Sequence, residues 1–97
     1  MLDGKQRRYL RGLGHHLQPV VQVGKDGVSA SLVKAAEQTL EDHELIKVKI
    51  LEGAGDRHEL AESLADKCKA ELAGVLGRTA LIYRARKKDP KIKLPRT

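Results

Sequence analysis

An alternating run in the middle of the chain constrains the fold more than any other feature. Residues 45–51 have the sequence LIKVKIL, in which two lysines alternate with β-branched side chains. Successive side chains of a β-strand point to opposite faces, so Lys47 and Lys49 would share one face and their β-branched neighbours the other. The run therefore predicts a half-buried strand with a basic outer face, which requires a core layer on its inner side.

The segments around this strand alternate between helical and extended patterns. With 97 residues, the chain has room for one core and one small domain. In chain order we expect a helix over 3–13, a strand over 19–23, a helix over 29–42, the strand over 45–51, a helix from 56 to about 72, a brief strand at 75–76 and a strand over 80–83. Strands that alternate with helices are typical of layered α/β or α+β domains. We predict a single compact α-β-α-β-α-β-β domain, with a mixed four-stranded sheet and the helices packed on it.

Several classes of protein find no support in the composition. The single cysteine, Cys68, excludes an intramolecular disulfide framework, and its place on an apolar helix face predicts a buried, inert thiol. No apolar run approaches the ~18 residues that span a bilayer, and the first residues lack the apolar centre of a signal peptide. We therefore expect a cytoplasmic protein. The four histidines have no cysteine or carboxylate cluster beside them, and no catalytic arrangement is evident. We expect no metal, no cofactor and no enzymatic activity.

The positive charge is concentrated at the two ends of the chain. The net charge is +6, yet residues 15–83 carry eleven acidic and only eight basic groups. This excess of positive charge suggests a polyanionic partner. The only aromatic residues are Tyr9 and Tyr83. Their scarcity argues against modules that stack bases on aromatic platforms and favours a protein that contacts the nucleic-acid backbone.

A turn flanked by glycines is the sharpest candidate site. Gly24, Lys25, Asp26 and Gly27 lie between an expected strand and an expected helix. The glycines permit a sharp turn and the close approach of a phosphate, Lys25 adds a positive charge, and the helix start adds oriented N–H groups. A GxxG loop of this kind clamps the nucleic-acid backbone in KH domains. The alternative is an ordinary strand-to-helix turn, which these four residues alone favour.

Two further elements add basic side chains that fit the same partner. In the helix over 3–13, Tyr9, Leu10 and Leu13 fall in one arc and arginines in the opposite arc. The second element is the basic face of the strand over 45–51. The candidate contacts outside the turn are Lys5, Arg7, Arg8, Arg11, Lys47 and Lys49. Each element alone fits a solvated charged face equally well.

The last residues form a basic segment over 85–97. Such a segment fits a flexible arm that binds nucleic acid without sequence preference, and it equally fits a solvated tail. Ile92, Leu94 and Pro95 interrupt the charges and could dock part of the segment on the body of the domain.

Four blocks of sequence occur in a familiar order. They are residues 11–27 (RGLGHHLQPVVQVGKDG), 44–50 (ELIKVKI), 77–84 (GRTALIYR) and 93–96 (KLPR). Together they resemble the CRM domain (chloroplast RNA splicing and ribosome maturation), most closely in its stand-alone bacterial, YhbY-like form. The resemblance covers about residues 4–96. We expect residues 1–84 to form a CRM-like RNA-binding domain and residues 85–97 a basic C-terminal tail.

The resemblance implies a fold similar to the C-terminal domain of translation initiation factor 3. It also implies RNA binding, association with precursors of the large ribosomal subunit, and a role in ribosome assembly. The family's GxxG motif, implicated in RNA contact, matches residues 24–27. One departure concerns the third strand: Ala73 and Gly74 precede a short apolar pair, where such proteins have a longer β-rich segment. The length of that strand stays open.

The leading hypothesis is a monomeric RNA-binding protein whose partner is ribosomal RNA of the large subunit or its precursor. The alternative is a protein-interaction module that docks on a ribosomal protein or an assembly factor, with RNA contact incidental. An enzyme that acts on RNA is disfavoured by the missing acid–base or metal constellation. DNA remains an electrostatic alternative, because charge alone does not distinguish it from RNA.

Overall fold

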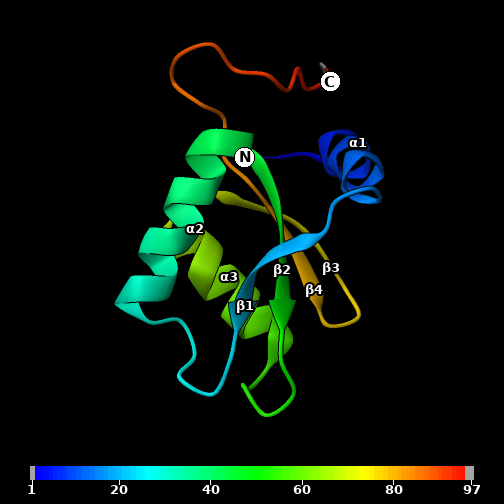
Figure 1. Ribbon diagram of the computed structural model, residues 1–97. Coiled ribbons are helices and arrows are strands. Elements are labelled where there is room, and N and C mark those ends of the chain that lie inside the picture. The colour runs from blue at the N-terminus through cyan, green and yellow to red at the C-terminus, as the bar shows by residue number, and fades with distance from the viewer. Residues whose placement is uncertain (1, 96–97) are drawn as a thin grey trace.

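The computed structural model describes residues 2–95, whose helices and strands follow the expected order (Figure 1). Each helix begins after a polar residue whose side chain accepts a hydrogen bond from a backbone N–H of the first turn: Asp3, Ser29 and Asp56. The elements are α1 (Gly4–Gly14), β1 (Pro19–Val23), α2 (Ala30–His43), β2 (Leu45–Ile50), α3 (Arg57–Lys67), β3 (Glu71–Leu76) and β4 (Thr79–Tyr83).

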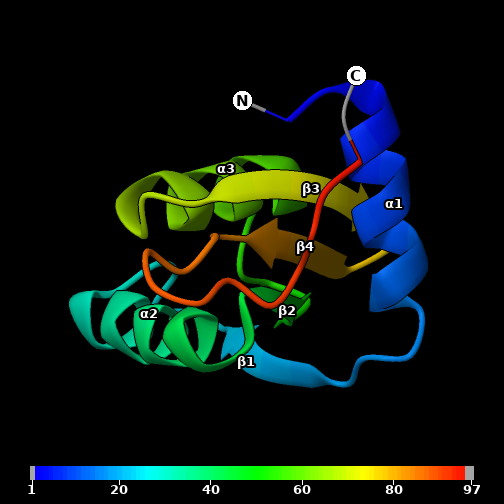
Figure 2. The ribbon, with the colours of Figure 1, turned by 90° about the horizontal axis from the view of Figure 1, so that it is seen from above.

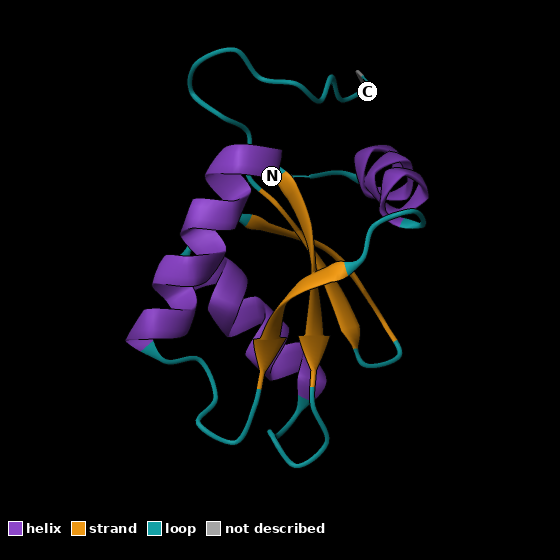
Figure 3. Ribbon diagram, viewed as in Figure 1, coloured by secondary structure: helices purple, strands orange, loops and turns teal. Residues whose placement is uncertain are grey.

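The strands form one mixed sheet in the order β1-β2-β4-β3. β1 and β2 are parallel, with α2 as the crossover between them, whereas β4 pairs antiparallel with β2 and β3. α2 and α3 lie on one side of the sheet and α1 on the other (Figures 2 and 3). We call these sides the inner and the outer face. The predicted α+β domain with a mixed four-stranded sheet is confirmed.

The main core lies on the inner face. Ile46, Val48 and Ile50 of β2 are at most 2% exposed and pack with apolar side chains of β1, β4, α2 and α3. On the outer face of the same strand, Lys47 is half-buried and Lys49 is exposed. The alternation along β2 therefore predicted both faces correctly.

A smaller core lies on the outer face beneath α1. Leu10 of α1 packs there with Leu45, Ala73 and Tyr83. The other half of this face is open: Lys49 of β2 and its β1 neighbour Gln22 are exposed, and Leu76 at the end of β3 is 79% exposed. The outer face thus has a covered end and an uncovered end.

α1 turns a different side toward the sheet than its helical periodicity indicates. Its buried residues are Leu10 and Gly14, whereas Tyr9 and Leu13 are 42% and 39% exposed. The physical reason is the fit at Gly14, where a Cβ would lie 2.5 Å from Leu81 Cδ1, so the helix backbone itself packs against β4. The sequence predicted that Tyr9, Leu10 and Leu13 form the apolar side of this helix. As a description of its buried side that prediction is wrong, because only Leu10 of the three is buried.

α3 is shorter, and β3 longer, than the sequence pattern predicts. The helix ends at Lys67 because Lys69 adopts a positive φ of 56° and Ala70 N donates a hydrogen bond back to Ala65 O at 2.8 Å. Leu72, expected at the end of the helix, lies in β3 instead. The third strand therefore has six residues, which removes the apparent departure from the CRM pattern.

Residues 85–95, which we call the C-terminal strap, turn back after β4 and run to the N-terminal part of α1 (Figure 2). Ile92 and Leu94 pack against the outer core, and Gln6 Nε2 donates a hydrogen bond to Pro95 O at 3.3 Å. Among the alternatives that the sequence left open for the basic tail, this segment therefore adopts the one in which it docks on the body of the domain. Residues 96–97 of that tail lie outside the described residues.

Glu44 is the anchor of the C-terminal strap. It is the single residue between α2 and β2 and has no exposed surface. Its carboxylate accepts three hydrogen bonds from backbone N–H groups of the strap, at 2.6–2.9 Å. The donors are Arg86, Lys91 and Ile92. A buried carboxylate therefore fixes a segment more than forty positions away in sequence.

Among residues 2–95, no helix has both the length and the apolar character that a membrane crossing demands.

Candidate nucleic-acid interface

The glycine turn connects the end of β1 to the start of α2. Gly27 N donates a hydrogen bond to Gly24 O at 2.9 Å, which closes the turn and leaves Lys25 and Asp26 exposed at its tip. Gly27 has a φ of +66°, a conformation that side chains disfavour. The backbone conformation of the turn therefore accounts for the glycine at position 27.

Gly24 differs from Gly27, because the fold does not require a glycine there. A Cβ at Gly24 would lie 3.8 Å from Leu51 Cδ1, which is ordinary van der Waals contact, and its φ is not positive. The missing side chain leaves the backbone beside Lys25 open to a close approach from outside. A phosphate group could use that space.

The basic face of β2 continues from this turn. Val23, which precedes the turn, pairs with Ile50, and Lys49 pairs with Gln22 of β1 and Thr79 of β4. Lys47 follows two residues further along the same face. Lys49 and Lys47 therefore lie along the outer face of β2, and the glycine turn lies at the end of the sheet, beyond the pair of Gln22 and Lys49.

α1 contributes unequally to this surface. Arg11 lies across β3, since a Cβ at Gly74 would lie 3.2 Å from Arg11 Cδ. With Lys47 and His15, it lines a cavity of about 420 Å³ between the end of α1 and the β3–β4 hairpin. We call this cavity the outer hollow. His15 is not among the candidate contacts predicted from the sequence, and its convergence with two cations depends on how α1 docks.

The remaining basic candidates lie elsewhere on α1. Arg7 lines a different cavity, of about 390 Å³, which it shares with Arg11 and with acidic side chains of α3 and β3. Lys5 and Arg8 are exposed and line none of the three cavities described in this section. The structure thus brings Arg11 together with Lys47, but not the whole basic set of α1.

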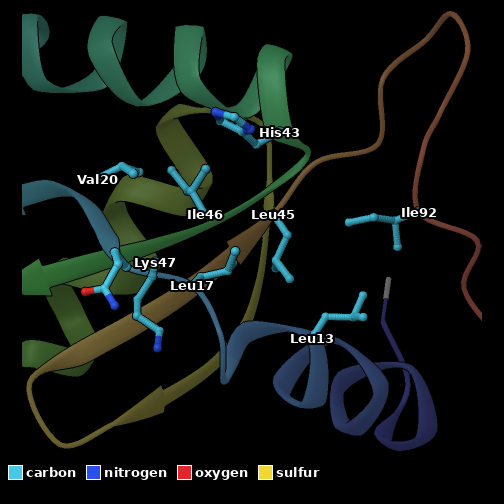
Figure 4. A pocket seen from close by; sticks show the side chains of 9 residues that line it. Leu13, Leu17, Val20, His43, Leu45, Ile46, Lys47 and Ile92 are labelled. Carbon is cyan, nitrogen blue, oxygen red and sulfur yellow. The ribbon is translucent and has the colours of Figure 1, made fainter.

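An apolar groove adjoins the outer hollow, with Lys47 lining both (Figure 4). Its volume is about 390 Å³, and its walls come from α1, β1, β2, the end of α2 and the C-terminal strap. Leu13 and Val20, exposed by 39% and 54%, stand at this groove. The sequence pattern assigned Leu13 to the buried side of a helix and therefore missed the groove.

The histidines and the cysteine do not gather into a metal-binding group in the described part of the chain. No group of three or more metal-binding side chains occurs among residues 2–95. Cys68 is fully buried, and burial, assisted by the nearby Glu37 carboxylate, raises the pKa of its thiol. The expectation of a buried thiol is confirmed.

Arg78 and Arg84 are basic residues that serve the fold. Arg78 Nε and Nη2 donate hydrogen bonds to Ile50 O and Leu51 O, at 2.9 and 2.7 Å, and hold the end of β2. Arg84 Nη1 donates to Cys68 O at 2.8 Å, and the guanidinium pairs with carboxylates of α2. Their charges are therefore partly engaged inside the protein.

Comparison with known proteins gives one family and close relatives. The model of the CRS1/YhbY (CRM) domain matches residues 2–84. The chain is 41% identical over 96 residues to the Bacillus subtilis (strain 168) protein named "Probable RNA-binding protein YqeI", with 98% of this chain and 100% of that protein covered. It is 35% identical over 96 residues to a Haemophilus influenzae protein named "RNA-binding protein", with coverages of 98% and 96%. The solution structure of a hypothetical protein from Staphylococcus aureus matches with a TM-score of 0.85 and 45% identity, over 98% of this chain and 100% of that chain.

Proposed function

Because the chain belongs to the CRS1/YhbY (CRM) domain family, we propose that it is an RNA-binding protein of the cytoplasm. Its partner in this proposal is the RNA of large ribosomal subunit precursors, whose assembly it assists as a monomer. The observation that carries the proposal is the line formed by Lys49, Lys47 and Arg11 on the outer face, with the glycine turn at the end of the sheet beyond Lys49.

The acidic side chains support an RNA path on the outer face. Six of the thirteen acidic residues belong to α2 and α3, which cover the inner face. Two of them, Glu37 and Glu41, are already paired with Arg84 at 3.5 and 3.4 Å. Even with Lys34, Arg57 and Lys67 counted, these two helices are net acidic, so a polyanion would favour the side that carries Lys47 and Lys49.

The proposed mechanism is recognition of structured RNA through its phosphates. The open backbone at Gly24 admits the RNA, Lys25 neutralises a phosphate, and Lys47, Lys49 and Arg11 extend the contact. Lys5, Arg7, Arg8, Asp26 and Gly27 complete the proposed set, as outer α1 contacts and as turn residues. With few aromatic side chains, the shape and the backbone of the RNA dominate its recognition.

The test is the salt dependence of binding to a purified fragment of large-subunit ribosomal RNA. We expect a steep loss of affinity with rising salt, and a log–log slope that falls by about one for each phosphate contact removed. Lys25→Glu should weaken binding strongly, and Gly24→Ala should weaken it without loss of thermal stability. Lys34→Glu, which makes the same change of charge at an exposed position of α2, is the charge-matched control. Salt-insensitive binding, or full affinity in Lys25→Glu, would refute the mechanism.

The ribosomal part of the proposal has its own measurement. In sucrose gradients of cell extract, the protein should sediment with precursors of the large subunit, and Lys25→Glu should shift it toward the top of the gradient. Sedimentation of both forms with other RNA particles, or with none, would contradict the assignment to large-subunit assembly.

The apolar groove favours a second candidate, a module that docks on a ribosomal protein or an assembly factor. Exposed Leu13 and Val20 at a concave surface are typical of a protein interface. Binding of naked ribosomal RNA at physiological salt separates the two candidates, because only the first requires it.

A further inference from the structure

The outer hollow is the place where basic side chains from separate elements of the described chain converge. Arg11 comes from α1, His15 from the segment that follows it, and Lys47 from β2. None of the residues that line this cavity is acidic. A cavity with such a rim is suited to a ligand that carries negative charge.

The floor of the hollow is largely apolar. Leu81 lies on it, and Leu76, 79% exposed, stands at its edge. Gly14 packs against Leu81 and Gly74 lies beside Arg11, so neither glycine adds a polar side chain to the lining. Thr79 adds a hydroxyl group that can donate or accept a hydrogen bond. A flat, mostly apolar group with polar edges would fit this floor.

We propose that the outer hollow binds the base of one unpaired RNA nucleotide, whose phosphate is held by Arg11 and Lys47. This inference rests on the proposed function and names the RNA feature that the interface selects. Bases that are splayed out of a helix offer their faces and edges to side chains, whereas bases inside a duplex are stacked and paired. The base lies on Leu81, and His15 and Thr79 face its polar edges.

The position of the hollow favours RNA over a peptide as its occupant. Lys47 lines the hollow and also belongs to the basic face of β2 that begins at the glycine turn. A strand that follows this face therefore arrives at the hollow without leaving the protein surface. The neighbouring groove in Figure 4 has Lys47 as its single lysine or arginine and more aliphatic walls, so it lacks the same charge complementarity.

The experiment compares two RNA hairpins, one fully paired and one with a single unpaired nucleotide. In the bulged hairpin this nucleotide carries the fluorescent base 2-aminopurine. We expect the intact protein to bind the bulged hairpin at least about fivefold more tightly than the paired one, since one hydrogen bond to the base adds this order of affinity. The fluorescence of 2-aminopurine should change on binding and become less accessible to a soluble quencher.

Two substitutions test the hollow itself. Leu76→Ala removes its exposed apolar edge, and Thr79→Val removes its hydroxyl while keeping the side-chain volume. Each should lower the ratio of the two affinities toward one and restore access of the quencher. Val20→Ala is the matched control, because it shortens an exposed apolar side chain that lines the neighbouring groove. Thermal unfolding of each variant shows that the fold is retained.

The outcomes separate this inference from the proposed function. If the intact protein binds both hairpins equally with a steep salt dependence, the hollow does not bind a base, although RNA binding stands. If neither hairpin nor ribosomal RNA is bound, the proposed function fails as well. A preference that survives both hollow substitutions, or that Val20→Ala abolishes, would also overturn the assignment to the outer hollow.

Discussion

The buried carboxylate of Glu44 offers the most quantitative test of the structure. Replacement by glutamine keeps the shape of the side chain, removes its charge and turns two N–H donors toward backbone groups that are themselves donors. The donors at stake are the N–H groups of Arg86, Lys91 and Ile92, at 2.9, 2.6 and 2.8 Å. We expect Glu44→Gln to lower the free energy of unfolding by about 2–3 kcal/mol, the scale of one or two hydrogen bonds to a charged group. For a domain of this size that is a fall in Tm of roughly 8–24 °C.

The effect of Glu44→Gln should depend on pH in a defined direction. Burial by itself raises the pKa of Glu44, but the N–H groups of Arg86, Ile92 and Lys91, together with the Arg86 charge, outweigh it and hold the pKa below the ordinary 4.5. The ionised carboxylate therefore stabilises the fold fully above pH 4.5, and this contribution is lost as the pH falls through the lowered pKa. The intact protein and the variant should converge in stability in that acidic range.

Urea unfolding followed by circular dichroism measures both quantities. Asp42→Asn, which removes an exposed carboxylate two positions from Glu44, is the control and should change stability little. The reasoning is refuted if Glu44→Gln costs no more than this control near neutral pH. It is equally refuted if the difference between the variant and the intact protein is the same at every pH.

Two further predictions concern α1 and the thiol. Gly14→Ala should lower the free energy of unfolding by about 1–3 kcal/mol in thermal unfolding, because its Cβ would overlap Leu81. Gly12→Ala, whose Cβ meets nothing within 4 Å, should stabilise the helix by roughly 0.5–1 kcal/mol. Equal effects of the two substitutions would contradict the packing of α1. Cys68 should react with a thiol reagent only at the rate of unfolding, because it is buried with a raised pKa, and rapid reaction of the native protein would contradict that burial.

The order of the elements was predictable because it depends on local patterns. Alternation in β2 and a capping residue before each helix are visible in a short window of sequence. The end of α3 was not predictable in this way. It is set by Lys69, which adopts a positive φ although lysine carries no signal for it, and the apolar residues that follow continue a helical pattern.

The surface of the candidate site was predictable only in part. Lys47 and Lys49 follow from the period of a strand, and the turn at 24–27 follows from its glycines. The outer hollow could not be foreseen, since it depends on the close approach of Gly14 to Leu81, a contact between residues far apart in sequence. The partners of Glu44 are equally distant, so its role as an anchor was hidden for the same reason.

The anchoring of the C-terminal strap has a consequence for how the protein reaches its native state during synthesis. Residues 86–92 follow every strand in the chain, so they leave the ribosome after the residues of the sheet. Until then the Glu44 carboxylate is without its backbone donors, and the outer core lacks Ile92 and Leu94. The inner core can therefore form first, whereas the cover of the outer face is completed by the arrival of the strap.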